Sequence, residues 1–137
     1  MMTRSKLVLT AFVALIVCLG LGYAWGASGR LTIQGALDDT KQQLDLAEAR
    51  GHILDARVSL YNSNFGDAAA RFEDAKAPLK RVKERYQEAG RSDAASGIDA
   101  ALGHVEEAKR LAGKLDQGAN NPAGEALEAI KVATSKS

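Results

Sequence analysis

The chain opens with an apolar run: residues 7–29 contain no charged side chain. As a helix rising about 1.5 Å per residue, these 23 residues cover roughly 34 Å, enough to cross a hydrocarbon core of about 30 Å. Tyr23 and Trp25 lie near the distal end of the run, where amphipathic rings favour the headgroup region. The pattern predicts a membrane anchor over residues 1–29 and a soluble domain over residues 30–137.

Two other interpretations of this run stay open. A cleaved signal peptide would use the basic residues before the run and the small residues near Gly26 and Ala27. A lipoprotein signal would use Cys18, although Val17 before it is larger than such a signal prefers. As the sole cysteine, Cys18 cannot form an intramolecular disulfide.

Basic residues on either side of the run bear on topology. Arg4 and Lys6 precede it, whereas Arg30 and then Lys41 follow it. Because basic residues favour the cytoplasmic side, we expect a single-pass protein with a cytoplasmic N-terminus and an exported helical domain, in the periplasm or an equivalent compartment.

Gly22 and Gly26 have the GxxxG spacing that lets another membrane helix approach closely. The sequence therefore makes these two glycines candidate partner-binding residues within the anchor. The structural interpretation of the same spacing is chance recurrence in a glycine-containing span.

After the run, apolar residues recur in alternating steps of three and four, which predicts a long helix over about residues 31–64. The spacing is coiled-coil-like, with Thr40 and Gly51 as interruptions, and Leu46, Ile53 and Leu60 widen the stripe. Such a wide stripe suits packing against two neighbouring helices. The stripe comprises Ile33, Leu37, Leu44, Ala47, Gly51, Leu54, Val58, Tyr61 and Phe65.

Three further helices are predicted, over about residues 67–89, 93–117 and 122–134. We expect Asn64 or Gly66 to take the left-handed conformation, Asp67 to cap the second helix, and that helix to continue through Pro78 with a kink. We expect Gly118 to end the third helix.

Because the connections are short, the predicted fold is all-α: a single transmembrane helix followed by an antiparallel three-helix bundle with a short fourth helix. Its alanine-rich core should give modest stability, which favours a protein partner or self-association.

The net charge of the region after the apolar run is close to zero. Only two of the 18 basic residues precede the apolar run, so 16 remain after it against 17 acidic residues. A nearly neutral domain lacks the surplus of Lys and Arg that phosphate binding needs, so we expect no nucleic-acid partner.

A basic stretch stands out locally, in which Lys76, Lys80 and Lys83 share one helix face. This face could bind an acidic partner or an anionic lipid headgroup. The alternative is that these cations simply favour the C-terminal part of a helix.

Residues 63–78 include Phe65, Ala68, Phe72 and Ala75 at spacings similar to those where a tetratricopeptide repeat turns into its second helix. The resemblance covers only these residues, and no second copy follows at the period of that family. It implies repeat-like helix packing and protein binding.

No phosphate loop, nucleophile motif or Cys/His couple occurs in the sequence. His52 and His104 lie on different predicted helices, but a metal site there would need further ligands. We therefore expect no catalytic, cofactor or metal residues and no enzyme activity.

The leading hypothesis is a membrane-anchored adaptor or accessory subunit, with a bacterial envelope as the expected setting. A ligand- or metal-binding sensory module is one alternative. A self-assembling structural envelope protein is the other.

Overall fold

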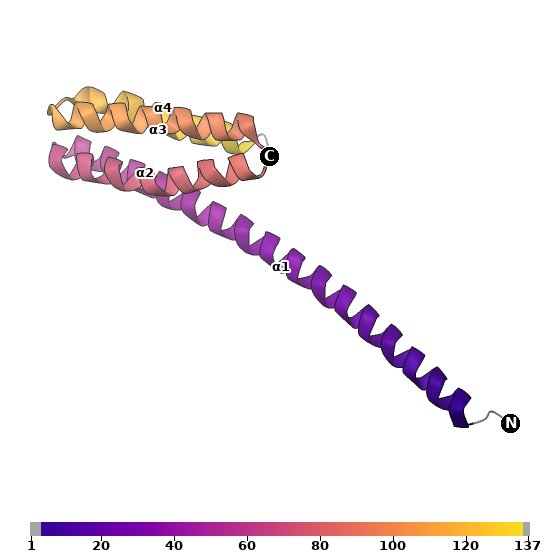
Figure 1. Ribbon diagram of the computed structural model, residues 1–137. Coiled ribbons are helices and arrows are strands. Elements are labelled where there is room, and N and C mark those ends of the chain that lie inside the picture. The colour runs from indigo at the N-terminus through magenta and orange to yellow at the C-terminus, as the bar shows by residue number, and fades with distance from the viewer. Residues whose placement is uncertain (1–3, 136–137) are drawn as a thin grey trace. The chain divides into compact units, whose positions relative to one another are not determined.

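A computed structural model of the chain describes residues 4–135, apart from the side chains of residues 4, 5, 7, 27, 28, 30 and 31 (Figure 1). Within the described range no β-strand occurs, which confirms the predicted all-α class. The elements are α1 (Arg4–Tyr61), α2 (Phe65–Glu88), α3 (Ser92–Gly113), the 3-10 turn η1 (Gln117–Ala119) and α4 (Asn120–Ser135).

The chain divides into two compact units, one up to Thr40 and one from Lys41 onward. In the first unit, Val8–Gly26 is a 19-residue helical segment long and apolar enough to cross a membrane. None of its side chains is buried. The predicted domain boundary after Gly29 depends on where a membrane would end, so it stays a prediction.

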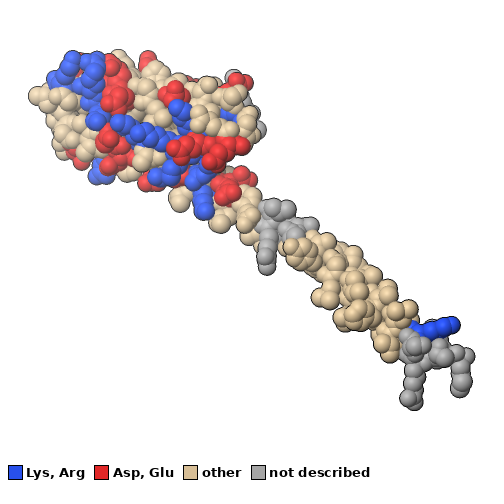
Figure 2. All heavy atoms as spheres, viewed as in Figure 1, with Lys and Arg blue, Asp and Glu red and all other residues tan. Residues whose placement is uncertain are grey.

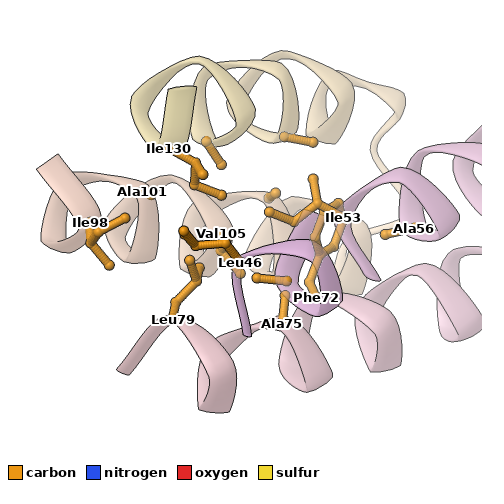
Figure 3. Close-up of a cluster of buried hydrophobic side chains, with 14 of the residues drawn as sticks. Leu46, Ile53, Ala56, Phe72, Ala75, Leu79, Ile98, Ala101, Val105 and Ile130 are labelled. Carbon is orange, nitrogen blue, oxygen red and sulfur yellow. The ribbon is translucent and has the colours of Figure 1, made fainter. Parts of the chain in front are cut away.

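In the second unit, consecutive helices α2, α3 and α4 run in opposite directions, and the end of α1 packs with them (Figure 1). Side chains from all four helices meet in one core, where Ile53, Phe72, Val105 and Ile130 are fully buried (Figure 3). More than half of the buried apolar residues are alanines, which lets helix axes approach closely while each residue buries little area.

The turn between α1 and α2 differs from the sequence prediction. Ser63 takes the left-handed conformation (φ 58°), and Gly66 lies inside α2. The side chain of Asn64 caps α2 by accepting a hydrogen bond from the backbone N–H of Asp67 at 3.3 Å. The predicted cap at Asp67 is therefore wrong, because α2 already begins at Phe65, which packs half-buried against the core.

α2 continues through Pro78 as a single helix, as predicted. α3, in contrast, ends at Gly113 rather than near residue 117, so the expected role of Gly118 as its terminator is wrong. Leu115 takes the left-handed conformation (φ 60°) after α3, and the N–H of Asp116 closes the turn onto the Leu111 carbonyl at 3.0 Å.

The close approach of α3 and α4 depends on one glycine. A Cβ at Gly97 would lie 2.8 Å from the Cβ of Ala133, too close for two helices in their present positions. Gly103, on the same helix, has no atom within 4 Å of such a Cβ, so of these two glycines only Gly97 is required for the packing of α3 on α4.

We expect Gly97→Ala to lower the free energy of unfolding by about 1 kcal/mol, because the added methyl forces α3 and α4 apart. Gly103→Ala is the matched control, and it should raise stability by up to about 1 kcal/mol through helix propensity alone. Denaturant unfolding of the full chain in mild detergent measures both. Equal effects of the two substitutions would show that the α3–α4 contact tolerates the methyl.

Candidate interaction surface on the first helix

The part of α1 in the second unit carries two apolar stripes. The inner stripe is buried in the core and consists of Leu46, Ala49, Ile53, Ala56 and Leu60. The outer stripe consists of Leu44, Ala47, Gly51, Leu54, Val58 and Tyr61. Each follows alternating steps of three and four, and a displacement of two residues turns about 200° around a helix, so the stripes lie on opposite sides.

The outer stripe is exposed at every position except Gly51, which is half-buried. The exposed fractions of its large side chains are 66% at Leu44, 50% at Leu54, 58% at Val58 and 70% at Tyr61. Leu54, Val58 and Tyr61 expose large apolar side chains at successive turns of the helix, and the small residues Ala47 and Gly51 separate them from Leu44. Such a row differs from the scattered single exposed residues of an ordinary surface.

This arrangement corrects the sequence interpretation. The residues expected to form the main packing stripe are the outer ones, whereas Leu46, Ile53 and Leu60, expected only to widen it, form the buried face. The physical reason is that Ala49 and Ala56 complete the inner stripe with small side chains, so that α1 can sit close to its neighbours.

A buried carboxylate fixes how α1 is rotated against α2. Asp45 is only 7% exposed and accepts hydrogen bonds from Arg81 Nη2 at 2.8 Å and from Arg85 Nη1 at 2.5 Å. Burial acts to raise the pKa of the Asp45 carboxyl, but the two guanidinium groups outweigh it and hold that pKa below its ordinary value. The charged, paired carboxylate therefore clamps α1 to α2.

On the opposite edge, α1 is joined to the C-terminal elements. Arg50 Nη2 donates to Thr134 Oγ1 of α4 at 3.3 Å, and Gln117 Nε2 of η1 donates to the Leu60 carbonyl at 2.8 Å. Both edges of the inner stripe are thus tied to neighbouring helices. The outer stripe faces away from these contacts.

The basic residues singled out in α2 lie against acidic residues. Lys76 Nζ lies 2.8 Å from Glu106 of α3 and 3.1 Å from Glu73, and these hydrogen bonds raise the pKa of Lys76. Lys83 Nζ lies 2.6 Å from Asp99. Lys80 is exposed and makes no ion pair with any described side chain.

Positive and negative charges accordingly alternate over the visible face of the second unit (Figure 2). Lys76 and Lys83 join α2 to α3, and their charges are largely offset there. Binding of an acidic partner or an anionic lipid through Lys76, Lys80 and Lys83 stays a prediction.

The two histidines lie in different surroundings. His52 Nε2 lies 3.8 Å from Glu48, and His104 Nδ1 lies 3.0 Å from Glu125. Among the described residues, no group of three or more His, Cys, Asp or Glu side chains could hold a metal ion.

One surface hollow, of about 310 Å³, lies between α2 and the start of α3 and contains neither histidine. It is open to solvent and is lined by Lys83, Gln87, Ser92, Ala95, Ser96 and Asp99. These side chains include no catalytic constellation.

Gly22 and Gly26 lie in the apolar segment of α1, and a Cβ at either glycine would meet no described atom within 4 Å. Nothing in the described chain therefore packs against this GxxxG face. Its use by another membrane helix stays a prediction.

No protein-family model, curated protein or solved structure matches this chain. The resemblance of residues 63–78 to a tetratricopeptide-repeat turn consequently stays a prediction. The outer stripe was visible in the sequence as a coiled-coil-like spacing. Its exposure was missed, because spacing alone does not tell which of two apolar faces enters a core.

We expect Asp45→Asn to lower the free energy of unfolding by about 1–3 kcal/mol at pH 7, because it leaves Arg81 and Arg85 without their buried carboxylate. The folded-state pKa of Asp45 is depressed, so its stabilisation is present above the unfolded-state pKa and is lost as the pH falls through the folded-state pKa. The difference between wild type and variant should therefore shrink in acid.

Denaturant unfolding at several pH values measures this difference. Asp74→Asn is the control, since Asp74 is exposed on α2 and pairs with no described side chain. A difference between wild type and Asp45→Asn that stays constant into strong acid would contradict the clamp.

Proposed function

We propose that this chain is a membrane-anchored, non-catalytic helical module that works as an adaptor or accessory subunit through protein–protein contact. The observation that carries the proposal is the outer stripe of α1, a row of exposed apolar side chains on a helix whose other face is already buried. A folded domain that leaves such a face uncovered has a surface suited to a partner.

The proposed anchor is Val8–Gly26, retained as a single-pass transmembrane helix. Its exposed leucine, isoleucine, valine and phenylalanine side chains suit lipid, and no charged residue interrupts it. The proposed topology keeps the N-terminus in the cytoplasm and exports the helical domain, on the basis of Arg4 and Lys6 before the span.

The second unit is the proposed scaffold that presents the outer stripe. An antiparallel bundle built from α2, α3 and α4 holds the inner stripe, and the Asp45 clamp sets the rotation of α1. This arrangement turns Leu44, Leu54 and Val58 toward solvent.

The proposed partner is a helix with the same apolar spacing. Apolar residues in alternating steps of three and four form the seam of a coiled coil, in which each side chain inserts between residues of the facing helix. Polar and charged residues border the outer stripe, among them Glu48, Arg50 and Asp55, as at the edges of such a seam.

A photo-reactive side chain at Leu54 tests the proposal in the full chain, expressed in its native membranes. We expect the chain to stay with the membranes after alkaline extraction and to cross-link to protein upon irradiation. The same photo-reactive side chain at Ala77, which is exposed on α2, is the control.

The proposal fails if position 54 cross-links no more protein than position 77 does. Release of the chain by alkaline extraction would remove the membrane anchor from the proposal and leave the contact surface to be judged by the cross-links.

A further inference from the structure

We propose that the partner of the outer stripe is a second copy of this chain, paired through α1 as a parallel, in-register, two-stranded coiled coil. The inference rests on the proposed function, because it takes the outer stripe to be a protein-binding face and the chain to be anchored. It adds the identity of the partner, its orientation and its register.

The spacing of the outer stripe matches a heptad repeat. Leu44, Gly51 and Val58 occupy the first apolar position of successive heptads, and Ala47, Leu54 and Tyr61 occupy the second. A β-branched residue at the first position and leucine at the second favour two strands in parallel coiled coils, as with Val58 and Leu54.

Membrane anchoring favours the parallel orientation. Two copies with the same anchor sequence insert with the same topology, so their chains leave the membrane on the same side. Identical helices paired in register then place each residue of the outer stripe opposite itself. The interface is thereby self-complementary, as twofold symmetry requires.

Gly51 gives a second, independent indication. It lies inside α1, about three turns before the helix ends, where glycine costs about 1 kcal/mol relative to alanine. Nothing in the described chain needs this glycine, since a Cβ there would meet no atom within 4 Å. With exposed Ala47 one turn before it, Gly51 forms a small patch within the outer stripe that would let a second helix approach closely.

The charges beside the outer stripe complement each other between copies. Arg50 comes just before Gly51, the first apolar position of a heptad, and lies at one edge of the seam. Asp55, five residues later, lies at the other edge. In a parallel in-register pair, these positions of opposite helices meet as an ion pair. Within one helix they lie about 140° apart and cannot meet.

Asp55 is available for this contact. It is exposed and makes no hydrogen bond or ion pair with any described side chain. Arg50 is half-buried and reaches Thr134 Oγ1 at 3.3 Å, a long hydrogen bond that leaves the remaining guanidinium N–H groups for a carboxylate. Gln43 and Glu48 repeat the same spacing one heptad earlier, as a polar pair.

Cysteine cross-linking of the full chain in membranes tests the pairing directly. In a Cys18→Ser background, Ala47→Cys places one thiol in the outer stripe, where an in-register pair brings two Cβ atoms within reach of a disulfide. Ala77→Cys and Ala100→Cys make the same change at exposed positions on α2 and α3. Mild oxidation should give several-fold more disulfide-linked dimer with Ala47→Cys than with either control.

A charge exchange tests the register and the orientation. Added to Ala47→Cys, Arg50→Glu should lower the yield of dimer several-fold, because the new carboxylate faces Asp55 of the other copy. Asp55→Arg in the same chain should restore the yield. A loss caused only by the Arg50–Thr134 hydrogen bond would not be restored by Asp55→Arg, since that substitution does not touch Thr134.

The outcomes separate this inference from the proposed function. Equal dimer yields from Ala47→Cys and the controls overturn the homodimer. If photo-cross-linking from Leu54 then captures a different protein, the proposed function is kept and the homodimer is rejected. Absence of any cross-linked protein from Leu54 removes both. Failure of Asp55→Arg to restore the dimer overturns the parallel register.

Discussion

The ion-pair clamp at Asp45 is the interaction on which the account of α1 depends. A helix with apolar residues on two opposite sides can pack into a core with either side, and the hydrophobic effect alone distinguishes the two weakly. The carboxylate of Asp45, held by Arg81 and Arg85, is compatible with only one rotation of the helix. That rotation buries Leu46, Ile53 and Leu60 and leaves Leu54 and Val58 in solvent.

The alanine-rich core limits the stability of the second unit. Small side chains such as Ala56 and Ala133, together with Gly97, let the helices approach closely but bury little apolar surface per residue. A domain of this kind gains stability when the outer stripe is covered, because burying Leu44, Leu54 and Val58 on association adds large aliphatic contacts to those of its alanine-rich interior. Stability and partner binding are thus coupled through one helix.

Much of the fold could be predicted from the sequence, and the reason is periodicity. The uncharged run identified the candidate span, the steps of three and four identified the helices, and the continuous apolar phase across Pro78 correctly indicated one helix. The ends of helices were less predictable, because several residues competed for each cap. Asn64 rather than Asp67 caps α2, and Leu115, a residue with no intrinsic preference for the left-handed conformation, closes the end of α3.

The candidate surface was predictable only in part. The coiled-coil spacing of the outer stripe can be recognised in the sequence. Its exposure depends on contacts between α1 and residues far away along the chain. Asp45 pairs with Arg81 and Arg85, which lie 36 and 40 positions further along the chain, and no local sequence pattern predicts that contact. The ion pairs of Lys76 and Lys83 with α3 are equally non-local, so a basic helix face gave no sign of the acidic residues beside it.

The most direct test of the central claim compares two leucines on the two sides of α1. Leu60 is fully buried and Leu54 is 50% exposed, so Leu60→Ala and Leu54→Ala make the same change on opposite faces. For both variants, the free energy of unfolding is measured on the dilute chain. Association is measured as the mass of the chain in detergent at high concentration. Leu60→Ala should cost about 2–5 kcal/mol of stability. Leu54→Ala should change the unfolding of the dilute chain by no more than about 0.5 kcal/mol yet weaken association. Equal destabilisation by both substitutions, or association unaffected by Leu54→Ala, would contradict the division of α1 into a folding face and a binding face.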